Sequence, residues 1–203
     1  QPRVDYVTVA AMGWVIGALR SEIRVPHGVN IVSNPLAAID LAVATDAKFV
    51  RAAFTGAYLG EAGVITTDVA ATVRRRMQLN ASNIKMLYKV NPESDVYLAE
   101  RSIQKVTKSI LFHCFPDGLC VSGSSAGSET DDGVLKDVKA VAGDVPVFCN
   151  TGCTAQNVVQ KLSAVDGTCV GTAFKAEGKF QNQVDPDRVL EFMDIVRDYR
   201  RML

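Results

Sequence analysis

The 203 residues contain 22 basic and 22 acidic side chains, and 48% of the residues are hydrophobic. A chain of this length can bury one sizeable core, so we expect a single domain over residues 1–203. The absence of long runs of either charge argues against a nucleic-acid-binding surface and against a polybasic membrane patch. The longest apolar stretch, residues 7–19, is shorter than the roughly 20 residues that a membrane span needs.

Short β-branched runs alternate with longer helical patterns along the chain. A helical pattern over residues 4–20 comes first, and six strands are then predicted at residues 29–32, 49–53, 84–90, 118–121, 145–149 and 168–170. Helix starts are predicted at Asn34 before Pro35, at Thr130 before two aspartates, at Thr154, and at Asp185 before Pro186, with the last helix reaching residue 202. Single helices between strands imply parallel pairing with right-handed crossovers.

Two features favour a closed barrel over a doubly wound sheet. Residues 117–123, which read DGLCVSG, are echoed by residues 166–172, which read DGTCVGT, as expected where equivalent strand ends recur around a ring. No GxGxxG or GxxxxGK[ST] pattern opens a helix, so the usual nucleotide signatures of open sheets are absent. A complete barrel takes about 250 residues. We therefore expect an α/β fold of the (β/α)8 TIM-barrel class that lacks the first two βα strands.

Three consecutive strand ends are rich in glycine and hydroxyl side chains. In TIM barrels, the loops after the last strands commonly bind phosphate through main-chain N–H groups. We therefore predict that a small phosphorylated metabolite binds at these loops. The predicted phosphate-binding residues are Ser122, Gly123, Asn150, Gly152, Cys153, Gly171 and Thr172. Each glycine taken alone is more simply explained as a turn residue, and the hypothesis depends on the three loops together.

Polar residues that interrupt apolar strands are candidates for catalysis. Alternate residues share one face of a strand, and polar ones are expected to point into the barrel mouth. The candidate catalytic residues are Asn30, Arg51, Lys85 and Lys89. Their cationic groups would neutralise an anionic substrate, and a desolvated lysine could act as a base or form a Schiff base.

Three features near these candidates each have two explanations. Lys85 begins its strand, where a structural ion pair on the barrel floor would explain it equally well. Glu93 follows Lys89 and is either a general base or a solvated turn residue. The glycine-bearing segment 54–63 is predicted to be a loop, acting either as a lid or as an ordinary connection.

Cysteine and histidine spacing predicts no metal site, and no cofactor is predicted, with the need for a divalent metal left open. The five cysteines indicate buried, reduced thiols. Cys153, in a glycine loop, is expected to be more exposed than the others, as a small turn residue rather than a nucleophile. No secretion signal is recognisable in these residues, so we expect a cytoplasmic protein.

Four segments of the chain resemble the BtpA/SgcQ family. They are residues 28–32, residues 49–58 with Phe-Thr-Gly-Ala-Tyr at 54–58, residues 117–123 and residues 170–175. The resemblance covers essentially the whole chain, and residues 54–58 are its most specific part. It implies a ribulose-phosphate-binding-type barrel with two further strands before the helix that opens this sequence. Residues 90–101 resemble the SgcQ branch more closely.

The resemblance implies two different kinds of function. The SgcQ branch is linked to sugar uptake and metabolism, whereas the BtpA branch is associated with photosystem I biogenesis, and no catalytic residue can be carried over from either. The resemblance and the predicted phosphate site together make a sugar-phosphate isomerase, epimerase or aldolase-type lyase the leading hypothesis. The alternatives are a non-catalytic assembly or binding protein of the BtpA type, and a nucleoside or phosphoribosyl hydrolase or transferase. A homo-oligomer is compatible with all three.

Overall fold

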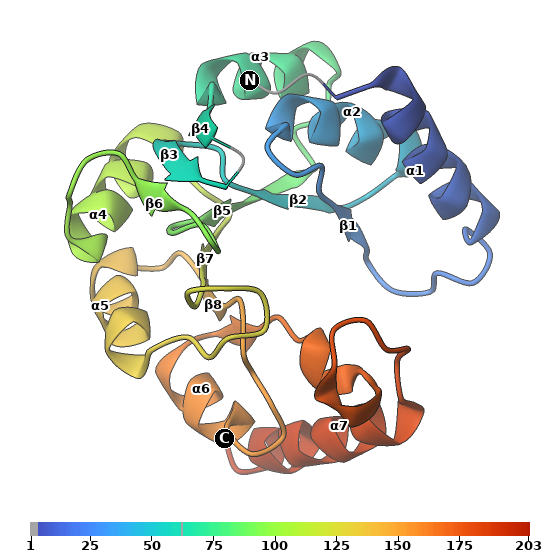
Figure 1. The fold of residues 1–203 in the computed structure, drawn as a ribbon, viewed down its shortest axis with the longest axis vertical. Coiled ribbons are helices and arrows are strands. Elements are labelled where there is room, and N and C mark those ends of the chain that lie inside the picture. The colour runs from blue at the N-terminus through green and yellow to red at the C-terminus, as the bar shows by residue number, and fades with distance from the viewer. Residues whose placement is uncertain (1–3, 62) are drawn as a thin grey trace. The chain divides into compact units, whose positions relative to one another are not determined.

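The computed structural model describes residues 4–61 and 63–203 and has an α/β fold (Figure 1). The chain divides into two compact units. The first unit comprises residues 1–89, 95–100 and 113–117, and the second comprises residues 90–94, 101–112 and 118–203. Among the helices of the described residues, none combines the length and the apolar character that a membrane crossing requires.

Three parallel strands form the main sheet of the first unit. They are β1 (Gly28–Val29), β2 (Phe49–Ala52) and β5 (Lys85–Lys89), with β2 paired to both neighbours. Helix α1 (Tyr6–Ala18) comes before β1, α2 (Pro35–Thr45) follows it, and α3 (Val69–Gln78) comes before β5. The three predicted strands are therefore confirmed, although each is shorter than expected at one or both ends.

The start of α2 follows from its sequence. The Asn34 Oδ1 atom accepts the N–H of Ala37 at 3.0 Å, and Pro35 occupies the first helical position, where its missing N–H is not needed. The helix packs against β2 and against α1, and its Ile39 and Leu41 side chains are buried, as is Val50 on β2. The opposite face of β2 and β5 is only half-buried.

A second, antiparallel sheet in the first unit was not expected. It consists of β4 (Gly63–Thr66), β3 (Ala57–Gly60) and β6 (Val96–Tyr97), in that order. The predicted loop at residues 54–63 is therefore wrong for its second half, which is a paired strand; residue 62 lies outside the described residues. The Tyr58 side chain is 1% exposed, and its hydroxyl donates to the main-chain oxygen of Thr55, so local contacts hold this segment in place.

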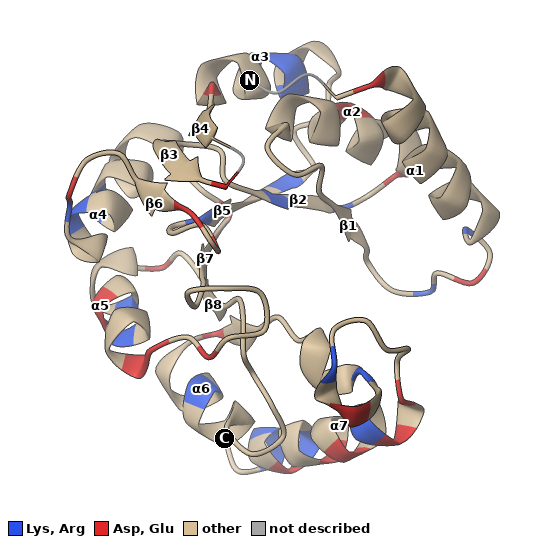
Figure 2. Ribbon diagram, in the orientation of Figure 1, with Lys and Arg blue, Asp and Glu red and all other residues tan. Residues whose placement is uncertain are grey.

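The second unit contains the remaining parallel strands and most of the remaining helices. The strands are β7 (Gly118–Val121), β8 (Val147–Cys149) and β9 (Gly167–Thr168), with β8 paired to both neighbours. The helices are α4 (Ile103–Cys114), α5 (Asp132–Ala142), α6 (Val158–Ala164) and α7 (Pro186–Arg201), with two short 3-10 helices, η1 (Thr172–Phe174) and η2 (Ala176–Gly178). Figure 2 shows basic and acidic residues interspersed along α7.

Of the three helix starts predicted in the second unit, the one at Asp185 before α7 is confirmed. The one predicted at Thr130 lies one residue early, because the N-cap of α5 is Asp131, which accepts the N–H of Val134 at 3.0 Å. The start predicted at Thr154 is wrong, because α6 begins after Asn157. The Asn157 side chain instead accepts the Thr154 N–H and donates to the oxygen of Gly152, which shapes the loop before the helix.

The repeated DG segments correspond to a repeated contact at the starts of two strands. In the first unit, the Asp117 carboxylate accepts the N–H of Met86 at 2.9 Å and an ion pair from Lys85 at 2.8 Å. In the second unit, the Asp166 carboxylate accepts the N–H of Val147 and an ion pair from Lys139, both at 2.7 Å. The sequence repeat thus reflects how each strand start is joined to its neighbour.

Candidate functional site

Three of the predicted catalytic residues share one face of the first unit's main sheet. Arg51 on β2 is in register with Leu87 on β5, so Lys89, two residues further along, lies on the same face as Arg51. Gly28 is in register with Phe49 and lies against its ring, so Asn30 continues this face beyond the end of β1. All three candidates are half-buried and lie toward the carboxyl ends of their strands.

Lys85 is not brought together with these residues. It begins β5, so about 13 Å of strand separates it from Lys89 at 3.3 Å per residue. Its ammonium forms the ion pair with Asp117, and its side chain is 62% exposed. Its position therefore favours the structural alternative, an ion pair at the starts of the strands.

Polar side chains in the second unit meet where β7 and β8 end. Ser122 and Asn150 directly follow these strands, and each is 4% exposed. The Asn150 Nδ2 atom donates to Glu93 Oε1 at 2.6 Å and to Ser122 Oγ at 2.7 Å, and Ser122 Oγ lies 3.4 Å from the same Glu93 oxygen. Two residues that were predicted to bind phosphate thus hold a carboxylate, which would repel a phosphate group at the same position.

Asn91 keeps Glu93 next to β7. Its side chain donates to the oxygen of Ser122 at 2.7 Å and accepts the Ser122 N–H at 3.0 Å, which reproduces the paired bonds of a β-ladder. The Val90 N–H also donates to the oxygen of Cys120 at 2.9 Å. Glu93 is therefore carried on a segment fixed at two points, and it is not a freely solvated turn residue.

The glycines of the first two predicted phosphate loops are required by close packing between the loops. A Cβ atom on Gly152 would lie 2.2 Å from Glu129 Cα, and one on Gly123 would lie 2.6 Å from the oxygen of Ser128. The N–H of Gly123 donates to Thr151 Oγ1 at 2.6 Å, so this amide is already used within the protein. Gly123 therefore cannot donate to a phosphate while this bond is made.

Other main-chain donors in these loops remain available. The N–H groups of Gly152, Gly171 and Thr172 donate to no acceptor among residues 4–61 and 63–203. A Cβ atom on Gly127 would lie 3.0 Å from Thr172 Oγ1, so the loop after β7 reaches the segment after β9 as well as Gly152. The structure therefore brings the three predicted loops of the second unit together.

Cys153 is not exposed, contrary to expectation. Its side chain is 2% exposed and packs with Val158, Phe192 and Val196 in a cluster between α6 and α7. Burial raises the pKa of the Cys153 thiol to about 11, so the thiol is protonated at neutral pH and is a poor nucleophile. Only its main-chain atoms could serve a phosphate site.

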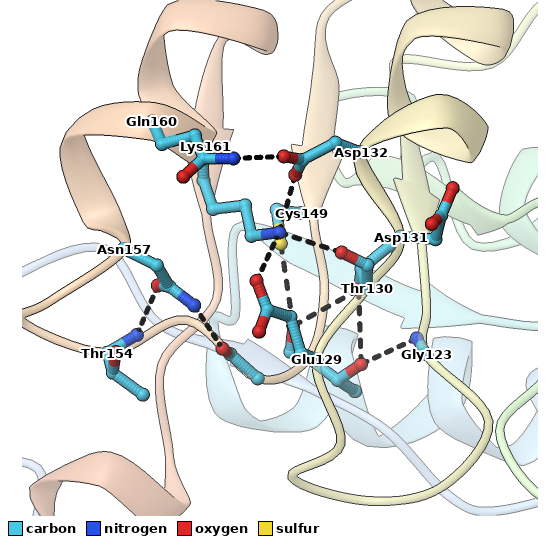
Figure 3. Close-up of polar contacts among 12 residues, drawn as sticks. Gly123, Glu129, Thr130, Asp131, Asp132, Cys149, Thr154, Asn157, Gln160 and Lys161 are labelled. Carbon is cyan, nitrogen blue, oxygen red and sulfur yellow. Dashed lines mark hydrogen bonds and ion pairs between the residues drawn. The ribbon is translucent and has the colours of Figure 1, made fainter.

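Lys161 was not among the predicted site residues, although it is a buried charged residue of the second unit. Figure 3 shows its ammonium among Glu129, Thr130 and Asp132. Its side chain is 1% exposed, and its Nζ atom contacts Glu129, Asp132 and the oxygen of Thr130. The sequence contained one sign that Lys161 is buried: it comes three residues after Val158, on the apolar side of the helix α6. No cluster of three or more His, Cys, Asp or Glu residues that could hold a metal occurs among residues 4–61 and 63–203.

The fold is similar to that of a solved isomerase. The structure of phosphoribosyl anthranilate isomerase from Thermococcus kodakaraensis matches with a TM-score of 0.58, covering 94% of this chain and 81% of that one. The two sequences are 16% identical, so the likeness shows the fold alone: an α/β fold of the TIM-barrel type.

Sequence comparison identifies closer relatives. The Escherichia coli protein named putative sgc region protein SgcQ is 46% identical over 194 residues, covering 96% of this chain and 72% of that protein. The photosystem I biogenesis protein BtpA of Synechocystis sp. is 26% identical over 198 residues, covering 97% of this chain and 69% of that protein. A sequence profile of the BtpA family matches residues 1–198. The resemblance found in the sequence is therefore confirmed, and the chain belongs to the BtpA family.

Proposed function

We propose that the second unit binds the phosphate group of a small phosphorylated metabolite, and that the protein is a sugar-phosphate isomerase, epimerase or aldolase-type lyase. The observation that carries this proposal is the meeting of Glu93, Ser122 and Asn150 at the strand ends, next to glycine loops with unused N–H groups. Active sites of TIM-barrel enzymes lie at the carboxyl ends of the strands. Relatedness to SgcQ, named for the sgc region, is compatible with this function.

The two groups of polar atoms suit two different parts of such a substrate. The N–H groups of Gly152, Gly171 and Thr172 suit the phosphate, because main-chain donors in glycine loops bind anions without adding a side chain. The Glu93 carboxylate suits the sugar carbon next to a carbonyl, from which it would remove a proton as general base. Returning that proton to another carbon gives isomerisation, and returning it to the other face of the same carbon gives epimerisation.

Asn150 and Ser122 are positioning residues in this proposal. Their donors hold one oxygen of the Glu93 carboxylate at 2.6 Å and 3.4 Å. A base held in one orientation loses less freedom when the substrate binds, which favours proton transfer. The charged face with Arg51 and Lys89 belongs to the first unit, and its contribution to turnover is a separate prediction.

Thermal stabilisation against a panel of pentose and hexose phosphates, each paired with its unphosphorylated sugar, tests the proposal. A ligand at about 100 times its dissociation constant should add roughly 2.7 kcal/mol to the free energy of unfolding. We expect shifts with phosphorylated compounds only. Equal shifts with both members of every pair, or no shift with any compound, would count against phosphate binding.

Two variants separate binding from chemistry. Gly171 has open space around it, so Gly171→Asp adds a negative charge beside the proposed phosphate without a clash, and it should abolish the phosphate-specific shift. Ser163→Asp adds the same charge on the exposed side of α6 and should leave the shift intact. Glu93→Gln should keep the shift but lower turnover by at least about 100-fold, the usual scale for a lost general base.

A non-catalytic assembly role is the second candidate, favoured by an exposed apolar row on the antiparallel sheet. Leu59 is in register with Val64 on one side and with Val96 on the other, and all three are exposed. The relative BtpA is named for photosystem I biogenesis. Under this candidate, replacing the three residues with threonine would release a protein partner that the wild-type protein retains, and no phosphorylated compound would stabilise the protein.

The finer details of the fold remain proposals. We propose that the complete barrel has two further βα strands, because the matched regions cover only 72% of SgcQ and 69% of BtpA. A structure of a full-length relative in which these residues close a barrel alone would contradict it. A cytoplasmic location, a homo-oligomer and activity without a cofactor also stay predictions.

A further inference from the structure

Lys161 in the second unit holds a buried charge that the proposed reaction does not use. Its Nζ atom donates to the oxygen of Thr130 at 2.8 Å, to Asp132 Oδ1 at 2.5 Å and to Glu129 Oε1 at 2.7 Å. An ammonium has three N–H donors, so these three contacts use all of them. Burial alone would lower the pKa of Lys161, but the hydrogen bonds to Asp132 and Glu129 outweigh it and hold the pKa above its ordinary value.

These contacts fix one end of the loop between β7 and α5, residues 122–131. Thr130, whose oxygen accepts from Lys161, is fully buried, and its hydroxyl lies 3.1 Å from the oxygen of Thr151 and 3.3 Å from Thr151 Oγ1. The Thr151 hydroxyl in turn accepts the Gly123 N–H at 2.6 Å. Hydrogen bonds thus run from Lys161 through two threonines to the other end of the same loop.

The 122–131 loop also packs next to residues whose main-chain N–H groups are proposed to bind phosphate. Its residue Glu129 lies directly over Gly152, and its residue Gly127 lies beside Thr172. A displacement of the loop would therefore change the space next to two of the three proposed phosphate donors, Gly152 and Thr172. Lys161 itself is too buried to touch a ligand, which excludes a direct catalytic role for its ammonium.

We propose that Lys161 is a positioning residue, whose ammonium fixes the 122–131 loop over Gly152 and so sets the geometry of the phosphate-binding donors. This inference rests on the proposed function for its effect on phosphate, but its effect on the loop is independent of any ligand. Replacing Lys161 removes both ion pairs to the loop end and leaves the oxygen of the fully buried Thr130 without this donor, so the loop should loosen.

Two variants distinguish an effect of Lys161 on the position of the loop from an effect of its charge on phosphate. One ammonium faces two carboxylates, so Lys161→Met raises the local negative charge by one unit, and adding Glu129→Gln removes one unit again. The double variant restores the wild-type local charge but not the bond to Thr130. Lys139→Met is a matched control, because it removes another lysine of the same unit from an ion pair, the one with Asp166.

The experiment measures hydrogen exchange of the amides of residues 122–131 and 151–154 and, in the same samples, the dissociation constant for inorganic phosphate. We expect at least tenfold faster exchange and at least tenfold weaker phosphate binding in both Lys161→Met and the double variant, with Lys139→Met unchanged in both measurements. Unchanged exchange in Lys161→Met would overturn the inference. Restoration of phosphate affinity to within twofold of wild type in the double variant would also overturn it, because Lys161 would then act by charge.

Two further outcomes keep the test decisive. If the wild-type protein does not bind phosphate, the proposed function is what fails, and the exchange rates alone decide the role of Lys161. If Lys161→Met does not fold, Glu129→Gln is used instead, because it removes the ion pair between the loop and Lys161 at a side chain that is 60% exposed, where folding tolerates the change. Faster exchange confined to residues 122–131 then supports the inference, and unchanged exchange there refutes it.

Discussion

Replacing Gly152 with alanine tests whether the two glycine loops pack as closely as the structure shows. The φ angle of Gly152 is +69°, and an added Cβ would lie 2.2 Å from Glu129 Cα, 2.4 Å from Glu129 N and 2.4 Å from the oxygen of Ser128. The left-handed conformation costs about 1–2 kcal/mol for alanine. All three neighbouring atoms are main-chain atoms that cannot rotate away, so overpacking adds roughly 1–3 kcal/mol. The expected loss of stability is therefore about 2–5 kcal/mol.

Urea denaturation measures this loss as a shift of the unfolding midpoint. With a slope of about 2 kcal/mol per molar urea, the midpoint should fall by on the order of 1–2.5 M. Gly171→Ala is the matched control, because its Cβ would meet nothing within 4 Å and its φ of −135° is not in the left-handed region. We expect the Gly171 variant to stay within about 0.5 kcal/mol of wild type. A Gly152→Ala midpoint equal to that of the control would refute the close packing of the loops.

Three other properties follow from the structure. Burial acts to raise the pKa of Asp166, but hydrogen bonds from Lys139 and a main-chain N–H outweigh it, so the pKa is lowered from its ordinary value of 3.8. The ionised Asp166 therefore stabilises the folded state at neutral pH, and this stabilisation is lost as the pH falls below 3.8. Urea midpoints from pH 7 to pH 3 should therefore fall less steeply in Asp166→Asn than in wild type. Cys153, with its pKa raised to about 11, should react with iodoacetamide at pH 8 only after unfolding, as mass spectrometry would detect. Arg51→Met and Lys89→Met should each lower turnover of a substrate found in the panel by roughly 10- to 100-fold, the scale of a lost charged hydrogen bond.

Two of these predictions have a control variant that shares their chemistry, and the thiol prediction has an outcome that would contradict it. Asp144→Asn removes an exposed carboxylate of the same unit and should leave the acid dependence as it is in wild type. Thiol labelling of Cys153 in the folded protein at the rate seen in urea would show that the cluster around it opens readily. Lys48→Met removes an exposed cation at the start of β2, and a loss of turnover equal to that of Lys89→Met would mean that overall charge, not position, matters.

Features that depend on neighbouring residues were predictable from the sequence. Asn34 and Asp185 cap helices through bonds to residues two or three positions away, and the alternation of strands and helices reflects the same short range. Thr154 failed as a helix start although its residue type suits the role, because Asn157 binds the Thr154 N–H and shifts the start of the helix. Competition between two possible caps is decided by loop geometry, which a residue pattern does not contain.

The antiparallel sheet depends on contacts between distant residues. Tyr58 is in register with Tyr97, and their rings lie 4.7 Å apart across 39 positions of sequence. The segment 57–60 is short and ends in glycine, so its local sequence is typical of a loop. The β-branched residues at 64–67 were a weak sign of a strand, but pairing with β6 cannot be inferred from local pattern alone.

Glycines in strand-end loops have two physical explanations, and only the structure distinguishes them. Gly123 and Gly152 are needed because another loop occupies the place of a side chain, whereas Gly171 has open space around it and an unused N–H. In the sequence, all three glycines follow a predicted strand, and nothing in the pattern distinguishes them. The lack of a side chain at Gly152 is explained by the close approach of Glu129, whereas packing does not explain it at Gly171. Substitution of Gly171 consequently tests phosphate binding, while substitution of Gly152 tests packing, and neither result can stand in for the other.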